Sequence, residues 1–334
     1  MPDSLRIAVV GAGHLGRWHA QQLAGLDGVE LAAICDPEPS RKALADLYKC
    51  PWVKDLDDLD DNLDGVVIAA PTTRHHDLAS HFLNRKIPCL VEKPIAATSD
   101  EARAMCDLAE KQDTLLQIGH IERFNPALRV VADRLDSPRF LEAVRVAPYP
   151  FRATDVGVVL DLMIHDLEII LSLVKSDIKE VRAWATPIFS PSEDLAAAWI
   201  EFENGTCAQL KAVRTALRSE RRLRVYQSDT YVEIDFMDRE ATVVRRDPRL
   251  ESGEIKPNNM TPDDLAGRSP LDFVQEQLVS IEKPPVDQDA NPLREELAAF
   301  VHCIRTGSPP LVGGRDGLRA MEAADLVHKA AKIS

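Results

Sequence analysis

The rhythm of apolar and polar positions changes near residue 121. Before it, short apolar runs rich in β-branched residues alternate with longer stretches whose apolar residues recur at helical spacing. This alternation predicts strand–helix–strand units and a parallel sheet. The predicted strands are Leu5–Val10, Val29–Cys35, Val66–Ala69, Pro88–Val91 and Leu115–Ile118. The predicted helices are His14–Leu26 and Ser99–Lys111.

Beyond residue 121, several short strands punctuated by turn residues predict a largely antiparallel sheet, with Asn204-Gly205 as a hairpin signal. These strands are Lys179–Ala185, Leu195–Phe202, Thr206–Val213, Arg222–Gln227, Thr230–Phe236 and Ala241–Arg245. Helical spacing returns at Leu160–Val174, Pro292–Arg305 and Asp316–Ala331, and the Pro- and Asp-rich stretch Lys283–Pro292 is predicted to be a connector. A chain of 334 residues suits two domains, predicted at 1–121 and 122–334.

Composition and charge narrow the classes of partner. With 45% hydrophobic and 28% charged residues, the chain has the composition of a globular protein. A net charge of −14 argues against nucleic-acid and anionic-membrane partners. No long uncharged apolar run predicts a membrane span, and the N-terminus runs into a strand without an export signal. Six scattered cysteines without a CxxC pair suit a reducing, cytoplasmic location.

The first predicted strand runs directly into the turn Gly11-Ala12-Gly13-His14-Leu15-Gly16, which opens the first predicted helix. In the dinucleotide fingerprint the first glycine permits the tight turn, the second lets the backbone approach a pyrophosphate, and the third lets helix and strand pack closely. The N–H groups at the helix start bind the anion. A glycine triplet alone is weak evidence, but its place between strand and helix predicts nucleotide binding within a doubly wound Rossmann domain.

Asp36 ends the second predicted strand, where a carboxylate accepts hydrogen bonds from the ribose hydroxyls of NAD and repels the 2′-phosphate of NADP. Arg41 lies close behind and could meet that phosphate if Asp36 turned away. The expected cofactor is therefore NAD, with NADP left open.

Candidate chemistry comes from two places. Lys93 follows a buried strand in Glu92-Lys93-Pro94, at the edge where open α/β sheets bind ligands. On this triplet alone a solvated lysine is the favoured interpretation, since Glu282-Lys283-Pro284 repeats it inside a polar connector. Asp161 and His165 stand four residues apart, on one face of a predicted apolar helix. By spacing alone, a core histidine or a surface ion pair fits them just as well.

Together these residues suit the oxidation of an alcohol. The reaction needs a hydride acceptor, a base for the hydroxyl proton and a positive charge near the developing alkoxide. Nicotinamide, His165 and Lys93 would fill these roles, with Asp161 orienting His165.

The sequence resembles the glucose-fructose oxidoreductase and inositol dehydrogenase family (Gfo/Idh/MocA) over nearly its whole length. Besides the glycine turn and Asp36, the resemblance rests on Ala70-Pro71-Thr72 with His75, Glu92-Lys93-Pro94, Gly119–Pro126, Asp161 with His165, and Gly314–Ala320. It implies a Rossmann domain followed by an α+β domain with an open, mostly antiparallel sheet, whose exposed face builds homodimers or homotetramers. It also implies that Lys93, Asp161 and His165 are catalytic and that Ala70, Pro71, Thr72, His75 and Glu92 lie near the cofactor.

The sequence departs from the family pattern at two positions. Only Gly157 remains of the glycines that many members carry before the catalytic aspartate, and Glu168 stands where relatives often have aspartate. The substrate loop is therefore expected to differ.

Segments 119–126, 159–173 and 210–226 resemble most the branch that oxidises the 3-hydroxyl of UDP-N-acetylglucosamine. Arginines could form ion pairs with the diphosphate of such a substrate. Most of them could equally be solvent-exposed side chains on a strand face. The expected substrate contacts are Arg123, Asn125, Arg152, Asp161, His165 and Arg214.

Two other readings stay open: a dehydrogenase of a free polyol or hexose, and a non-catalytic NAD(P)-binding regulator. Retention of Lys93, Asp161 and His165 argues against the regulator. No metal site is expected, because the histidines do not combine with cysteines or carboxylates at a recognised zinc spacing.

Overall fold

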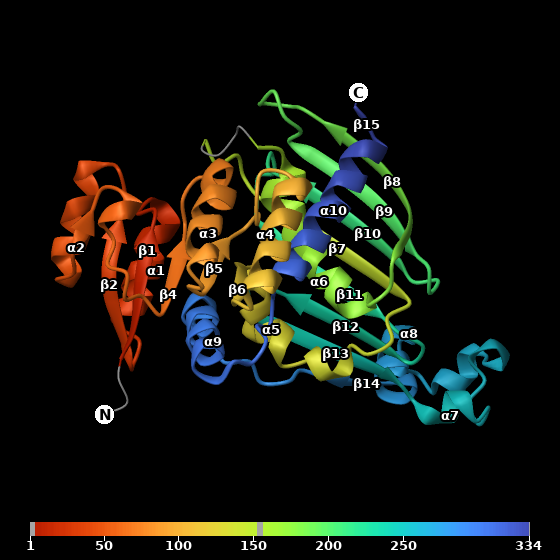
Figure 1. Ribbon diagram of the computed structural model, residues 1–334. Helices are drawn as coiled ribbons and strands as arrows, with labels where there is room; N and C mark the ends of the chain where they lie inside the picture. The colour runs from red at the N-terminus through yellow and green to blue at the C-terminus, as the bar shows by residue number, and fades with distance from the viewer. Residues whose placement is uncertain (1–3, 152–155, 334) are drawn as a thin grey trace. The chain divides into compact units, whose positions relative to one another are not determined.

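Two compact units make up the chain in the computed structural model, which describes residues 4–151 and 156–333, and only the backbone of residues 262, 263, 332 and 333 (Figure 1). The first unit comprises the chain up to Phe124, Val159–Ser172 and Asp289–Ala330. The second comprises Asn125–Val158, Leu173–Gln288 and the residues from Ala331 onward. The sequence predicted one boundary at 121, whereas each unit is assembled from three segments, and the first unit includes the stretch that carries Asp161 and His165.

The first unit is built on a six-stranded sheet in the order β3-β2-β1-β4-β5-β6 (Figure 1). All its neighbouring strands are parallel. Its strands are β1 (Leu5–Val10), β2 (Val29–Cys35), β3 (Trp52–Val53), β4 (Gly65–Ile68), β5 (Cys89–Glu92) and β6 (Leu116–Gly119). The strand order reverses direction at β1 and β4, as in a doubly wound nucleotide-binding fold. The predicted Rossmann domain is therefore confirmed, and only the two-residue strand β3 was not predicted.

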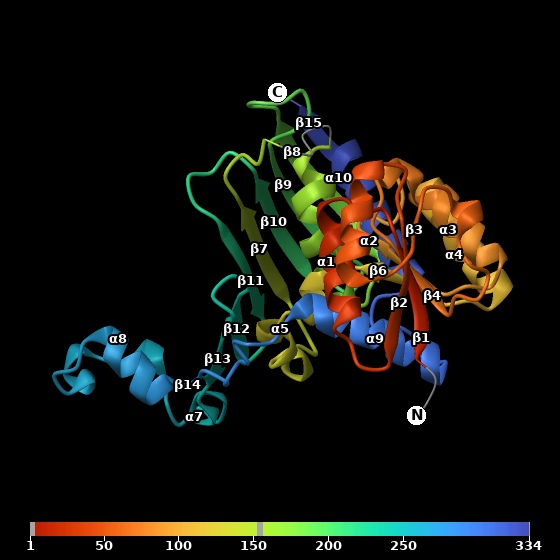
Figure 2. The same cartoon turned by 90° about the vertical axis from the view of Figure 1, so that its left-hand side faces the viewer.

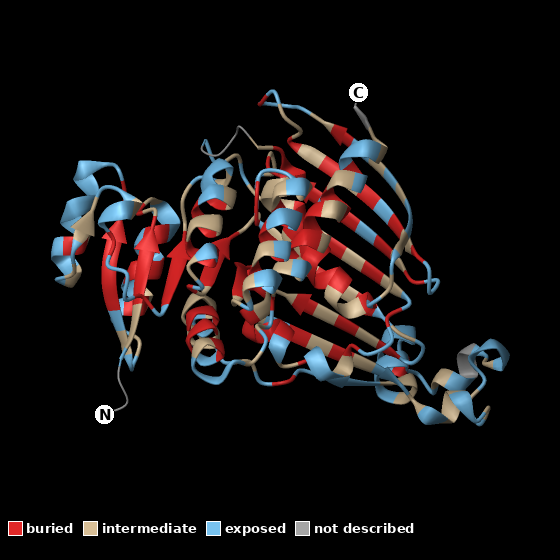
Figure 3. Ribbon diagram, viewed as in Figure 1, coloured by how far each residue is buried: buried red, intermediate tan, exposed pale blue. Residues whose placement is uncertain are grey.

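Helices bury both faces of this sheet, and its strands are mostly buried, as their red colour in Figure 3 shows. Alternate residues of one strand therefore enter different cores. Ile7 and Val9 of β1 pack with α1 and α9, whereas Ala8 and Val10 belong to the core formed with α3, α4 and α10. The helices of this unit are α1 (His14–Ala24), α2 (Lys42–Tyr48), α3 (His75–Asn84), α4 (Ser99–Gln112), α9 (Pro292–Thr306), α10 (Gly314–Ala330) and most of α6 (Ile164–Val174). Thr98 caps α4 by accepting the Glu101 N–H at 3.2 Å.

The second unit is built on a nine-stranded sheet in the order β14-β13-β12-β11-β7-β10-β9-β8-β15, which Figure 2 shows edge on. Only the β7–β10 and β8–β15 pairs are parallel. Its strands are β7 (Phe140–Val146), β8 (Ile178–Thr186), β9 (Leu195–Phe202), β10 (Cys207–Val213), β11 (Glu220–Tyr226), β12 (Thr230–Asp235), β13 (Glu240–Arg246), β14 (Val279–Glu282) and β15 (Ala331–Ile333). The mostly antiparallel sheet is thus confirmed.

Burial alternates along these strands, so one face is packed and the other carries polar and aromatic groups. The predicted Asn204-Gly205 hairpin joins β9 to β10, with Gly205 at φ +84°, where glycine is favoured. Among the described residues of this unit are three short α-helices: α5 (Pro126–Arg129), α7 (Pro248–Glu251) and α8 (Pro270–Phe273). No described helix is both long and apolar enough to cross a membrane.

Candidate active site

The glycine turn has the geometry that a bound pyrophosphate requires. Gly11 has φ +90°, and a Cβ at Gly16 would lie 1.8 Å from the Gly11 carbonyl oxygen. Neither position tolerates a side chain. A Cβ at Gly13, in contrast, would meet no atom within 4 Å, so this residue faces open space at the start of α1. The three glycines therefore close the turn, pack helix on strand and leave room for the ligand.

A pocket of about 580 Å³ opens beside this turn. The Asp36 carboxylate lies on its wall, where it accepts the Ala12 N–H at 2.7 Å and the Glu38 N–H at 2.9 Å. Asp36 thus stabilises the glycine turn through the Ala12 N–H and also lines the pocket. The other lining residues include Gly11, Gly13, Arg41, Lys54, Ala70, Pro71 and Arg74. A pocket with this lining suits the adenosine half of a dinucleotide.

Lys54 and Arg74 were not predicted, although both follow the carboxyl ends of strands, which is where ligands bind in such sheets. Together with Arg41 they give the pocket three cations around Asp36.

The other predicted cofactor residues divide into exposed and buried groups. His14 and Leu15 are exposed at the start of α1, and Thr72 is half-buried at the start of the turn before α3. His75 is buried, and its ring nitrogens each lie 2.9 Å from a carbonyl oxygen, that of Ala70 and that of Pro94. His75 therefore joins the loop after β4 to the loop after β5.

Lys93 and Asp161 are in contact. The lysine ammonium donates to the Asp161 main-chain oxygen at 2.8 Å and lies 3.4 Å from its carboxylate. Asp161 lies in a π-helical turn, Val159–Met163, which leads into α6, and His165 lies in the first turn of α6. The structure therefore brings these parts of the sequence together within one unit.

His120, directly after β6, packs against His165 with ring centroids 6.1 Å apart and near-perpendicular planes. Its side chain is buried, and neither ring nitrogen has a hydrogen-bond partner within the described part of the chain. Burial, reinforced by the charges of Lys93 and Arg123, lowers the pKa of His120 to about 3. His120 is therefore a neutral imidazole near physiological pH. His120 belongs to the family motif Gly119–Pro126, but no role was predicted for it from the sequence.

Glu168 lies one turn beyond His165 and receives a hydrogen bond from the Arg123 guanidinium at 2.6 Å. Burial raises the pKa of Glu168 to about 7, and the attraction of Arg123 opposes this shift. Arg123, predicted as a substrate contact, is thus held by a carboxylate of its own unit.

Glu92, predicted to lie near the cofactor, is buried and directed into the protein. One carboxylate oxygen lies 2.7 Å from His19 Nε2, and the other accepts the Lys93 main-chain N–H at 3.2 Å. Its contacts are with α1 and with the lysine that follows it.

The predicted substrate residues of the second unit also have protein partners. Arg214 is buried and donates to Asp194 at 2.7 Å and to Ser190 and Ser192 at 2.8 Å. Asn125 caps α5 and donates to the Phe236 carbonyl at 3.1 Å. Arg152 lies outside the described residues. The contacts of Arg214 and Asn125 favour structural roles over the predicted contact with substrate.

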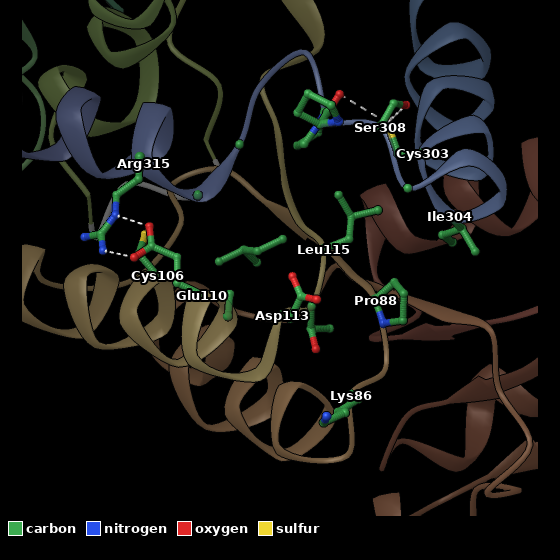
Figure 4. A pocket seen from close by; sticks show the side chains of 18 residues that line it. Lys86, Pro88, Cys106, Glu110, Asp113, Leu115, Cys303, Ile304, Ser308 and Arg315 are labelled. Carbon is green, nitrogen blue, oxygen red and sulfur yellow. Dashed lines mark hydrogen bonds and ion pairs between the residues drawn. The ribbon is translucent and has the colours of Figure 1, made fainter.

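A larger pocket, of about 690 Å³, lies at the amino ends of β5 and β6 (Figure 4). Arg315, one of the cations that line it, donates to Glu110 and Asp107, and the dashed lines in Figure 4 mark its bonds to Glu110. Because open α/β sheets bind ligands at the carboxyl ends of their strands, we place the active site at the opposite edge of the sheet, where Lys93 and the glycine turn lie.

Comparison with known proteins decides the family. Residues 5–120 match an oxidoreductase family with an NAD-binding Rossmann fold, and residues 134–233 match the GFO/IDH/MocA C-terminal domain. A UDP-N-acetylglucosamine 3-dehydrogenase from Acidithiobacillus ferrooxidans is 32% identical over 96% of this chain and 95% of its own. The chain belongs to the Gfo/Idh/MocA family. It is accordingly an NAD-binding dehydrogenase.

Other Gfo/Idh/MocA members resemble it in sequence or in fold. An inositol 2-dehydrogenase from Rhizobium meliloti is 26% identical over 96% of this chain and 95% of its own. The solved structure of the A. ferrooxidans enzyme GnnA superposes with a TM-score of 0.86 at 31% identity, covering 98% of this chain and 97% of that one. The predicted family and fold are therefore confirmed.

Proposed function

We propose that this Gfo/Idh/MocA protein oxidises the 3-hydroxyl of UDP-N-acetylglucosamine with NAD, using Lys93, Asp161 and His165. The observation that supports it most is the Lys93–Asp161 pair in the unit that carries the glycine turn. The 32% identity to a UDP-N-acetylglucosamine 3-dehydrogenase, over nearly the full length of both chains, supports this choice of substrate.

The nicotinamide ring, when bound, accepts the hydride from the carbinol carbon. His165 takes the hydroxyl proton, so that the alcohol loses two electrons and two hydrogens and becomes a ketone. The Lys93 ammonium stabilises the negative charge that develops on the oxygen. Asp161 positions the ammonium through its main-chain and side-chain oxygens, 2.8 and 3.4 Å away.

NAD is the proposed cofactor because the Asp36 carboxylate lines the adenosine pocket. Arg41, Lys54 and Arg74 line the same pocket and provide a means of accepting NADP. The ratio of kcat/KM for the two cofactors, in the wild type and in Asp36→Ala, tests this preference. We expect NAD to be favoured and the substitution to shift the ratio toward NADP.

We also propose that the exposed face of the nine-stranded sheet forms a homodimer or homotetramer. Aromatic side chains gather on neighbouring strands there: the Phe140 ring lies 5.7 Å from Trp199 and from Tyr226, and Tyr226 lies 4.8 Å from Tyr231. Exposed aromatic patches are typical of interfaces. Light scattering of the wild type and of Trp199→Glu tests this, with a smaller particle expected for the variant.

The enzyme assay measures NADH formation across UDP-sugars, free N-acetylglucosamine, inositols and hexoses. We expect the highest kcat/KM with UDP-N-acetylglucosamine and a fall in kcat of roughly a hundredfold or more for Lys93→Met and for His165→Asn. A preference for an uncharged polyol would instead favour the alternative substrate class. NAD binding without turnover of any sugar would favour a non-catalytic regulator, and full turnover in both variants would reject the catalytic assignment.

A further inference from the structure

Three buried side chains from distant parts of the sequence meet next to Lys93. They are His19 of α1, Glu92 at the end of β5 and Glu296 of α9, and one polar atom of each lies within 4.8 Å of the other two. His19 and Glu296 are fully buried, and Glu92 is 8% exposed. Two carboxyl groups in such a place need an explanation, because burying a charge is costly unless it is compensated.

Glu92 connects the cofactor-binding helix to the lysine. Through one oxygen it meets His19 Nε2 at 2.7 Å, and through the other it accepts the Lys93 N–H at 3.2 Å. A Cβ at Gly119 would lie 3.1 Å from this second oxygen, so the adjacent strand leaves little room for Glu92 to move. The carboxylate is therefore held on three sides.

Glu296 lacks any such bond: neither carboxyl oxygen has a hydrogen-bond partner among the described residues. Burial, followed by the nearby charge of Glu92, raises the pKa of Glu296 well above its ordinary value. Two carboxylates this close, away from water, cannot both ionise without a large cost, so one of them keeps its proton. The spacing suits a proton passed to Glu92 directly after a small side-chain movement, or through one buried water.

We propose that His19, Glu92 and Glu296 form a buried clamp in which the two carboxyl groups share one proton and which positions the Lys93 main chain relative to α1. This inference rests on the proposed function, since that function gives Lys93 its role in the reaction. Glu92 is then a positioning residue and not a contact of the cofactor. Glu296 is its neutral partner.

Kinetics separate these two roles of Glu92. We expect Glu92→Leu to lower kcat at least about tenfold with the KM for NAD changed less than about twofold, because misplacing a reacting group costs turnover. Glu92→Gln keeps the side-chain volume and is measured in the same assay in case Glu92→Leu does not fold. A cofactor contact would give the reverse, a raised KM for NAD at unchanged kcat, and would overturn the proposal.

Variants of Glu296 test the shared proton. Because a neutral amide mimics a protonated carboxyl group, Glu296→Gln should lose less than about threefold in kcat, whereas Glu296→Leu, which cannot donate to Glu92, should lose about tenfold. Phe300→Leu, a cavity-forming change on the same helix, is the matched control and should lower stability without moving kcat. Equal losses in Glu296→Gln and Glu296→Leu would overturn the neutral assignment.

Two readouts on the free enzyme do not depend on turnover. The infrared difference spectrum of wild type minus Glu296→Gln at pH 7, in which the contribution of Glu168 cancels, should show a protonated carboxyl band. Hydrogen exchange of the Lys93 amide should accelerate in Glu92→Leu. A divalent metal that copurifies at one per chain and is lost in Glu296→Gln would overturn the shared proton, as would absence of the band. If the wild type oxidises no sugar, the proposed function fails, while these readouts still decide whether the clamp exists.

Discussion

Buried ionisable side chains occur in both units, but their hydrogen-bonding groups are satisfied very differently. In the second unit, the Asp194 carboxylate meets Arg214 at 2.7 Å and accepts three main-chain N–H groups, from Ile188, Phe189 and Ser190. In the first unit, His120 has no hydrogen-bond partner in the described part of the chain and packs against His165, while one Glu168 oxygen is equally unpartnered.

The difference indicates which cluster stabilises the fold and which serves the reaction. Burial disfavours the Asp194 charge, but hydrogen bonds from Arg214 and the Ser190 and Phe189 amides hold the pKa of Asp194 well below its usual range. Such a completed network rigidifies the unit that contains it. Unpartnered polar groups cost stability, and proteins keep them mainly at functional sites.

Breaking the satisfied cluster should have the largest effect on stability. Arg214→Met leaves Asp194 as an unpaired buried charge, so we expect the free energy of unfolding to fall by roughly 3–5 kcal/mol in urea denaturation. Adding Asp194→Asn should recover part of the loss. A variant that stays stable but binds UDP-sugar weakly would instead support Arg214 as a substrate contact.

Glu168 should make the stability of the first unit depend on pH. Its pKa rises from an ordinary 4.5 to about 7, mainly through burial. Below pH 4.5 both folded and unfolded forms are protonated. Between pH 4.5 and about pH 7, Glu168 ionises in the unfolded form but stays protonated in the folded form. The free energy of unfolding therefore falls over this range, by roughly 3 kcal/mol in total. The difference in unfolding free energy between wild type and Glu168→Gln, measured from pH 4.5 to 7.5, should follow this curve; a constant difference would contradict the assignment.

His120→Phe should separate activity from stability. Phenylalanine removes two unsatisfied ring nitrogens and keeps an aromatic contact with His165, so we expect unfolding free energy to stay within about 1 kcal/mol or to rise. Turnover should fall about tenfold or more, because His165 loses its polar neighbour. Because His120 is already neutral near physiological pH, its own titration does not contribute to the pH profile of kcat there. The apparent pKa values of that profile should therefore be the same in His120→Phe and in the wild type. Lost stability with full activity would make His120 a structural residue.

Of these substitutions, one in an exposed ion pair should change the free energy of unfolding least. Lys42 and Asp46 lie 2.6 Å apart on α2, with side chains 58% and 62% exposed. We expect Lys42→Ala to change the unfolding free energy by less than about 0.5 kcal/mol, measured in urea at low and at high salt. A loss comparable to that of Arg214→Met would show that burial does not determine how much an ion pair contributes to the stability of this protein.

Local sequence signals predicted much of the fold. The runs Leu5–Val10 and Val29–Cys35 match β1 and β2 residue for residue, because buried parallel strands are continuous apolar runs. The strand β7, in contrast, contains Glu142 and Arg145 and follows a series of short turns. Its place in the centre of the sheet comes from pairing with β10 and β11, which no local pattern reveals.

The site residues that the sequence predicted are those that belong to short local motifs. Gly11, Gly13 and Gly16 are recognisable because their backbone is constrained within six residues. The sequence did not mark Glu296 as a site residue, because only the folded structure brings it close to Glu92, which lies far away in the sequence. Arg214 illustrates what composition alone does not reveal: an arginine in an acidic chain suggests an anionic ligand, whereas the structure pairs its guanidinium with Asp194 at 2.7 Å.

The most direct test of the account is the origin of the transferred hydride. UDP-N-acetylglucosamine carrying deuterium at carbon 3 should yield reduced NAD that is one mass unit heavier, and substrate labelled at carbon 4 should yield unlabelled NADH. Unlabelled NADH from the carbon-3 substrate, or reduction by an inositol alone, would contradict the proposed reaction.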